Sequence, residues 1–312
     1  MRRPLAALAV AAALLASLAG CVPGAPVNVK TAAVAKSIDS LPGITQVTVD
    51  SQEASYYTAP RSDVFADLAT DATAAQVARI LDAFAQENRR LGTDVVSSRL
   101  RLIVGSSANQ LDLEFAGLTD AQARAAADSW FALREQYETA LLHLSGPDDL
   151  TLDVTVTLGG EPSVERDLAA LADARDLETA LGPVSYFTAV DGNFGASRGL
   201  PDDAALDLAS AVAALIEVSG EYYGDEDSFG FKADFVPSDT ALQQQVAALV
   251  APGVAVDIAF RTADGTAVFL NTASCDAYAG LPADDPSVAL LAFWAADGRT
   301  LVDGSSVASC LA

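Results

Sequence analysis

The stretch RLRLIVGSSANQLDLEF, residues 99–115, decides the fold of the first half of the chain. Apolar residues alternate with polar ones on both sides of Gly105-Ser106-Ser107-Ala108, a pattern that predicts two half-buried strands joined as a hairpin. Placing Leu102 opposite Leu111 puts the apolar residues on one face and opposes each arginine to an acid. The other pairs in this register are Val104 with Asn109, Leu100 with Leu113, Arg101 with Asp112 and Arg99 with Glu114. We therefore expect both arginines on the solvent-exposed sheet surface, as partners of acids and not as an anion site.

Helices and strands surround this hairpin in a recognisable order. Thr73–Gln76 and Thr119–Gln122 each have the Thr-x-x-Gln pattern of a helix capping box. The second box predicts a long helix that ends at Gly146-Pro147. Strands are predicted at 62–68 and 150–158, and a further helix and strand at 31–41 and 44–49. The β-α-β-β-α-β order from residue 62 onward resembles the ferredoxin-like split βαβ fold, which implies a fold class but no activity.

The second half of the chain predicts another α+β domain. Its expected helices are 163–181, 201–218, one from 240 and 286–296, and its expected strands are 184–190, 229–235, 254–260 and 268–270. Three times a helix runs into a proline and glycine pair before a strand, at Pro42-Gly43, Gly182-Pro183 and Pro252-Gly253. An internal repeat would produce this pattern, and so would the common way in which chains leave a helix, which we favour.

The N-terminus has the three parts of an export signal. Two arginines precede an apolar run from Leu5 to Leu18, which is shorter than the roughly 20 residues of a membrane-spanning helix, and Leu18-Ala19-Gly20-Cys21 follows. This segment resembles the signal peptide and lipobox of bacterial lipoproteins. The resemblance implies cleavage before Cys21 and lipidation of Cys21, which would anchor the protein at the extracytoplasmic face of the cell membrane. The alternative is an ordinary secretory signal with a cysteine nearby by chance.

These features divide the chain into four parts. They are a signal peptide (1–20), a lipidated tether (21–30), a ferredoxin-like α+β domain (31–160) and a second α+β domain with a C-terminal disulfide (161–312). A length of 312 residues with 51% hydrophobic residues suits two domain cores. The 42 acidic against 18 basic residues give a net charge of -24. Such a polyanion is repelled by phosphate backbones, which excludes nucleic acid as a partner.

Cysteine and histidine are scarce. Besides Cys21 the chain has only Cys275 and Cys310, and in an oxidising exterior we expect these two to form a disulfide. The bond would close a loop of about 36 residues, worth about 3–4 kcal/mol, and pin the C-terminal tail. Two redox-active thiols are the alternative, but the Cys-x-x-Cys spacing is missing. His143 is the only histidine, which excludes multi-histidine metal sites, and its predicted place is a partly exposed helix end.

Other candidate chemistry has a structural interpretation. Gly195–Gly199 matches the Gly-x-Ser-x-Gly pattern of hydrolases, but no histidine follows it, so we reject hydrolase chemistry there. The acidic clusters are Asp148-Asp149, Asp202-Asp203, Asp225-Glu226-Asp227 and Asp284-Asp285. None has the spacing of a calcium-binding loop, and three fall at helix starts or loop tips, where carboxylates act as caps. No pair of acids is singled out for glycoside hydrolysis.

Aromatic residues concentrate in the second half. They are Tyr186, Phe187, Phe194, Tyr222, Tyr223, Phe229, Phe231 and Phe235. They could line a carbohydrate or peptide groove, although alternation along strands favours a place in the core.

The sequence thus predicts a membrane-anchored extracytoplasmic lipoprotein that acts without catalysis or a cofactor. We expect a binding or assembly module for an envelope protein or a small ligand, held at the membrane through Cys21. One alternative is a substrate-binding lipoprotein of a transporter, which would need a deep ligand cleft. Another is a carboxylate-based hydrolase, which would need at least two buried acids facing one pocket.

Overall fold

The structure is a computed structural model in which eight stretches of the chain are described. They are residues 27–53, 60–91, 97–114, 117–146, 152–160, 163–190, 192–237 and 240–310. The signal peptide, Cys21 and Asp148-Asp149 lie outside these residues. Residues 27–30, expected in the tether, form the first turn of helix α2 (Val27–Asp39). No helix in the described stretches is both long and apolar enough to cross a membrane.

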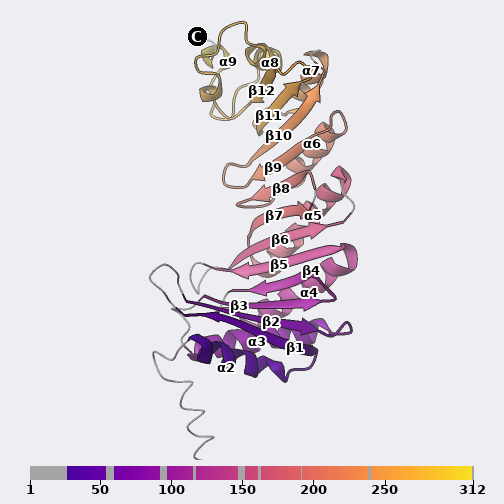
Figure 1. Ribbon diagram of the computed structural model, residues 1–312. Coiled ribbons are helices and arrows are strands. Elements are labelled where there is room, and N and C mark those ends of the chain that lie inside the picture. The colour runs from indigo at the N-terminus through magenta and orange to yellow at the C-terminus, as the bar shows by residue number, and fades with distance from the viewer. Residues whose placement is uncertain are drawn as a thin grey trace, which may run out of the picture. The chain divides into compact units, whose positions relative to one another are not determined.

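The chain divides into two compact units, shown from indigo to yellow in Figure 1. Of the described residues, the first unit comprises those up to 156 and those from 179 to 183, and the second comprises those from 157 to 178 and those from 184 onward. After α2, the elements that begin in the first unit are β1 (Ile44–Gln52), β2 (Arg61–Leu68), α3 (Ala74–Leu91), β3 (Ser97–Val104), β4 (Ser106–Leu113), α4 (Asp120–Gln136), β5 (Thr139–Ser145) and β6 (Asp153–Gly159).

The second unit continues the alternation of strands and helices. Its elements are α5 (Val164–Leu181), β7 (Val184–Val190), β8 (Phe194–Ser197), α6 (Asp203–Ala213), β9 (Ser219–Tyr223), β10 (Ser228–Val236), α7 (Thr240–Leu249), β11 (Ala255–Thr262), β12 (Ala267–Asn271), α8 (Pro286–Trp294) and α9 (Val307–Cys310), with short 3₁₀ helices η1 (Cys275–Tyr278) and η2 (Ala295–Asp297).

The strands follow the chain order from β1 to β12 in one mixed sheet, so the α+β class is right but the ferredoxin-like fold is wrong. A split βαβ unit needs another strand between its two parallel strands. Here α3 joins β2 directly to its parallel neighbour β3, with Val64 opposite Leu100. A hairpin followed by a helix is the recurring unit: β1 and β2, β3 and β4, β7 and β8, β9 and β10, and β11 and β12 are antiparallel pairs.

The three proline and glycine pairs occupy equivalent places in this arrangement. Pro42-Gly43 lies between α2 and β1, Gly182-Pro183 between α5 and β7, and Pro252-Gly253 between α7 and β11. Each glycine has a positive φ, at 97°, 108° and 82° respectively. Glycine adopts this backbone conformation without strain, so each pair ends a helix and starts a hairpin.

The expected long helix after Thr119 is wrong beyond Gln136. The capping box forms as predicted, but α4 ends at Gln136 and Tyr137 already has extended backbone angles. Ala140, Leu142 and Leu144 are buried in alternation, and β5 pairs with β4 in parallel. Residues 139–145 fit both a helical spacing and a near alternation of apolar residues, and the structure follows the alternation. His143 therefore lies on a strand and not at a helix end.

The predicted register of the β3–β4 hairpin is confirmed away from its turn. Leu102 lies opposite Leu111, and the chain also pairs Leu100 with Leu113 and Arg101 with Asp112. An irregularity after Ile103 puts Val104 opposite Ser106 and not opposite Asn109. Arg99 and Arg101 form ion pairs with Glu114 and Asp112. The expected exposure is wrong, because the Asp112 side chain is only 4% exposed.

In each unit the helices cover one face of the sheet and leave the other face open, as Figure 1 shows. Helical crossovers between parallel strands have the same handedness, and here each leads to the next strand in the same direction across the sheet. Their helices therefore lie on the same side of the sheet. Trp130 and Phe84 fill the helix-covered face of the first unit, and Phe229 and Phe231 stack in the second at 4.5 Å between ring centroids.

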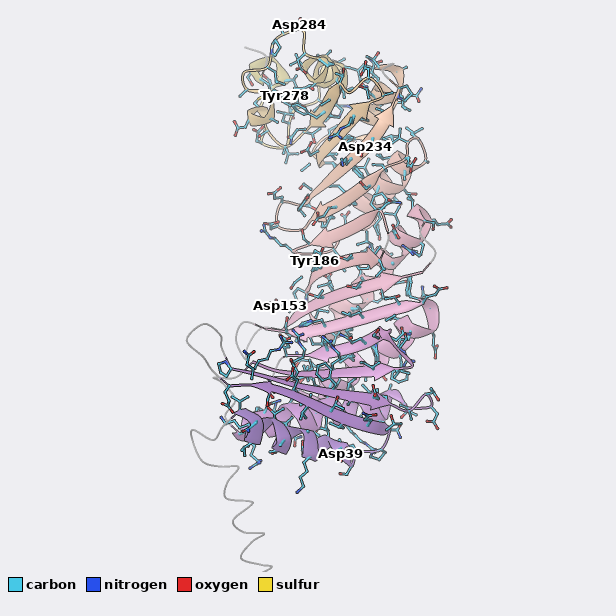
Figure 2. The ribbon with its side chains drawn as sticks, viewed as in Figure 1. Asp39, Asp153, Tyr186, Asp234, Tyr278 and Asp284 are labelled. Carbon is cyan, nitrogen blue, oxygen red and sulfur yellow. A yellow bond between two sulfur atoms is a disulfide. The ribbon has the colours of Figure 1, made fainter. Side chains whose placement is uncertain are left out.

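Most aromatic residues of the second unit belong to its core, as the alternation favoured. Phe187, Phe194, Tyr222, Phe229 and Phe231 are all buried. Of the aromatic residues singled out in the sequence, Tyr186 and Tyr223 are exposed, at 45% and 37%, and Figure 2 labels Tyr186 on β7. The placement of the Phe235 side chain lies outside the described residues.

The predicted disulfide is confirmed. Cys275 and Cys310 are bonded, with their Cα atoms 4.9 Å apart. The bond joins α9, at the C-terminus, to η1. Tyr278 of η1 is buried, and its hydroxyl accepts a hydrogen bond of 2.7 Å from the Asn271 backbone at the end of β12. The tail is thus pinned to the last strand of the second unit.

Candidate functional site

A groove of about 520 Å³ lies on the open face of the second unit, over strands β9 to β12. The open face carries the side chains that alternate with the buried aromatic residues. Its main lining residues are Glu221, Tyr223, Gly230, Lys232, Asp257 and Asn271. A partly open recess with polar groups that point into it is the common form of a small-ligand site.

Strand register brings the central residues of the groove into one row. Glu221 lies opposite Gly230, Gly230 opposite Asp257, and Asp257 opposite Asn271. Gly195 of β8 lies on the other side of Glu221. Because neighbouring strands are about 4.8 Å apart, the Cα atoms of Glu221 and Asp257 are about 10 Å apart, with the glycine between them. Because Gly230 has no side chain, the groove is deeper between Glu221 and Asp257 than any other residue there would leave it.

Tyr223 forms one wall of the groove. A Cβ atom placed on Gly230 would lie 3.2 Å from Cε2 of Tyr223, so the ring borders the glycine. The tyrosine hydroxyl donates to the carboxylate of Glu221 at 3.3 Å. Burial and the nearby Glu221 raise the pKa of Tyr223, which keeps the hydroxyl protonated as a donor. An aromatic ring packed beside a glycine also stabilises strand pairing, so Tyr223 has a structural role as well.

The acids of the groove lack basic partners in the described part of the chain. Neither Glu221 nor Asp257 belongs to an ion pair there, and Lys232 pairs with Asp234, labelled in Figure 2, at 3.4 Å. Neighbouring atoms displace water from Asp257 and raise the pKa of its carboxyl, although a hydrogen bond with Asn271 acts in the opposite direction. Excess negative charge therefore faces the groove.

This geometry suits recognition of a cation better than acid–base catalysis. Asp257 is exposed and Glu221 is only half-buried, whereas the hydrolase hypothesis required buried acids that face one pocket. Within the described stretches, no group of three or more His, Cys, Asp and Glu side chains could hold a metal ion. The groove can offer carboxylates, amide and hydroxyl groups and one aromatic ring to a ligand.

The hydrolase-like motif has a structural place. Gly195, Ala196 and Ser197 belong to β8, and Arg198 and Gly199 follow with positive φ values of 58° and 135°. Arg198 pairs with Asp225 at 2.5 Å, between the end of β8 and the turn after β9. His143 belongs to the first unit, where its Nε2 atom lies 3.9 Å from the carboxylate of Glu114. Arg198 and His143 thus each lie beside an acid.

The described acidic clusters mainly serve the secondary structure. Asp202 accepts a hydrogen bond of 2.8 Å from the Ala205 backbone and caps α6, and Asp285 caps α8 through Ser287 at the same distance. Asp203 pairs with Arg175. The interpretation of these acids as caps is confirmed for Asp202 and Asp285.

Among the main groove residues, only Tyr223 was singled out in the sequence, as one of the aromatic residues of the second half. Asp257 alternates with the apolar residues of a predicted strand, which is a visible signal for the open face. Glu221 had no comparable signal in the sequence, because no strand was predicted at 219–223. No family model, curated protein or solved structure matches the chain.

Proposed function

We propose that the protein is a lipid-anchored extracytoplasmic binding module and that its open-face groove binds a small polyamine, a ligand with at least two amine groups. The observation that carries the ligand class is the row of Glu221, Gly230 and Asp257, in which two acids without basic partners in the described chain flank a glycine floor. Two carboxylates whose Cα atoms are about 10 Å apart favour two ammonium groups separated by a short chain.

The location rests on the sequence of residues 1–21. An apolar run followed by Leu18-Ala19-Gly20-Cys21 supports export and lipidation at Cys21. Acyl chains at this position would hold the mature protein at the outer face of the cell membrane. A binding module there would meet its ligand outside the cytoplasm.

Calorimetry of the region from residue 27 onward, with spermidine and with butylamine as probes, tests the groove. We expect spermidine to bind more tightly than butylamine, and added salt to weaken binding because the acids are partly exposed. Glu221→Gln and Asp257→Asn should each weaken spermidine binding by about two- to five-fold, which corresponds to about 0.4–1 kcal/mol per exposed ion pair.

Asp276→Asn is the matched control, because it removes one exposed carboxylate of the same unit that does not line the groove. If this control weakens spermidine binding as much as Glu221→Gln does, the attraction is a property of the net charge and the proposed site is wrong. Equal affinity for spermidine and butylamine would contradict the polyamine ligand.

A further inference from the structure

A second recess lies on the helix-covered side of the same unit. It has a volume of about 420 Å³ and lies between α6, the end of α7 and strands β9 and β10. Leu208, Phe229, Leu249 and Val254 contribute its apolar walls. Leu249 is 37% exposed, so part of this apolar surface meets solvent. The recess lies on the opposite side of the sheet from the open-face groove, because Phe229 and Gly230 are successive residues of one strand and face opposite sides. The two cavities share only one lining residue, Ala255 at the start of β11.

The charged residues that line this recess are all acids. They are Asp202, Asp207 and Asp227. Asp202 caps α6, and Asp227 accepts a hydrogen bond of 2.6 Å from the hydroxyl of Tyr222. Burial and that contact raise the pKa of Tyr222 strongly, so its hydroxyl remains a donor to Asp227. Asp207 is exposed and takes part in no ion pair of the described chain.

We propose that this recess binds an amphipathic primary amine, with the alkyl part against Leu208, Leu249 and Val254 and the ammonium group near Asp207. Charge complementarity selects this occupant. A fatty acid or a phosphate ester would bring an anion to a rim of carboxylates, and a bare cation would gain nothing from the apolar walls. The volume lies in the usual range of small-molecule sites.

Three probes of equal chain length separate the contributions of head and tail. Octylamine, octanol and octanoate are titrated into the protein below their aggregation concentrations, and binding is followed by calorimetry and by NMR shifts of residues around the recess. We expect octylamine to bind at least five-fold more tightly than octanol, and octanoate to bind least. Equal binding of octanoate and octylamine would overturn the proposal.

Two variants locate the site. Ala204→Trp adds bulk at an exposed lining residue, so the protein should fold and octylamine binding should be lost. Asp207→Asn should weaken octylamine binding by about two- to five-fold and leave octanol binding unchanged. Asp276→Asn again serves as the control for net charge. Unchanged octylamine binding in both site variants would also overturn the proposal. Spermidine binding reports the open-face groove separately, so the two sites can fail independently.

Discussion

The indole Nε1 of Trp130 donates a hydrogen bond of 2.9 Å to the backbone carbonyl of Ala140 and so joins α4 to β5. Both residues are fully buried. Trp130→Phe keeps most of the ring but leaves that carbonyl without this donor, and we expect a loss of about 1–3 kcal/mol in the free energy of unfolding. Urea denaturation followed by circular dichroism measures the loss. Asp128→Asn, at an exposed position of α4, is the control, and an equal loss in both variants would contradict the role of the bond.

A second prediction concerns the partly buried pair of Arg101 and Asp112. The guanidinium makes two contacts of 3.2 Å with a carboxylate that is nearly inaccessible to water. Arg101→Met should cost about 1–3 kcal/mol, because the buried carboxylate loses its charged partner. Arg90→Met, which breaks the surface pair with Glu87, should cost at most about 1 kcal/mol. The comparison of the two unfolding free energies tests this difference, and similar costs would refute it.

Local periodicity predicted the β3–β4 hairpin correctly because the face of each residue is set within the strand itself. It also placed Phe229 and Phe231 in the core. Alternation does not say which strand lies next to which, and this is why the ferredoxin-like order was wrong. The parallel pairing of β2 with β3 depends on the path of the α3 crossover. Nothing in either strand specifies that path.

Strand β9 escaped prediction because a glycine occupies one of its core-facing positions. A Cβ atom on Gly220 would lie 2.9 Å from ring atoms of both Phe194 and Phe229, so the packed aromatic rings require glycine there. With glycine at position 220, apolar and polar residues do not alternate along 219–223, so no strand was predicted there. The helix before it was instead predicted to continue to residue 218, although α6 ends at Ala213. Because Glu221 lies on β9, its place on the open face could not be predicted from the sequence. Asp257 lies on a strand that was predicted, so its place on that face could be.

The disulfide supplies a third prediction. The double variant Cys275→Ser, Cys310→Ser should unfold more easily by about 3–4 kcal/mol in the chain-entropy estimate for a loop of this length. Hydrogen exchange should speed up first in η1 and α9, which the bond joins. Mass spectrometry of the exported protein without reduction should recover the two cysteine peptides as one species, and free thiols at both positions would contradict the assignment.

A fourth prediction tests the anchor. Cys21→Ser should prevent lipidation, so the protein should remain unprocessed or be released from the membrane. Membrane fractionation and the migration of the protein on gels follow both outcomes. Cys275→Ser serves as the control, because it removes a cysteine without changing Leu18-Ala19-Gly20-Cys21. If the Cys21 variant fractionates and migrates like the wild type, the lipoprotein assignment is wrong.

The last prediction follows from the raised pKa of Asp257. A carboxyl whose pKa is higher in the folded than in the unfolded chain binds its proton more tightly when folded. Its destabilising effect is therefore absent below the unfolded value of about 3.9 and grows as the pH rises through the folded value. Asp257→Asn should then raise Tm at pH 7 and lose this advantage near pH 3.

Thermal unfolding of the wild type and of Asp257→Asn between pH 3 and pH 8 measures this difference, with Asp276→Asn as the exposed control. A lower Tm for Asp257→Asn at pH 7 would show that the bond to Asn271 outweighs the displacement of water from Asp257. In the wild type, spermidine affinity should also fall as the medium is acidified, because Asp257 loses its charge at a higher pH than an ordinary aspartate does. In the Asp257→Asn variant, spermidine affinity should begin to fall only at a lower pH, because the titrating carboxyl is absent. The stability and affinity measurements would then report the same carboxyl of the groove.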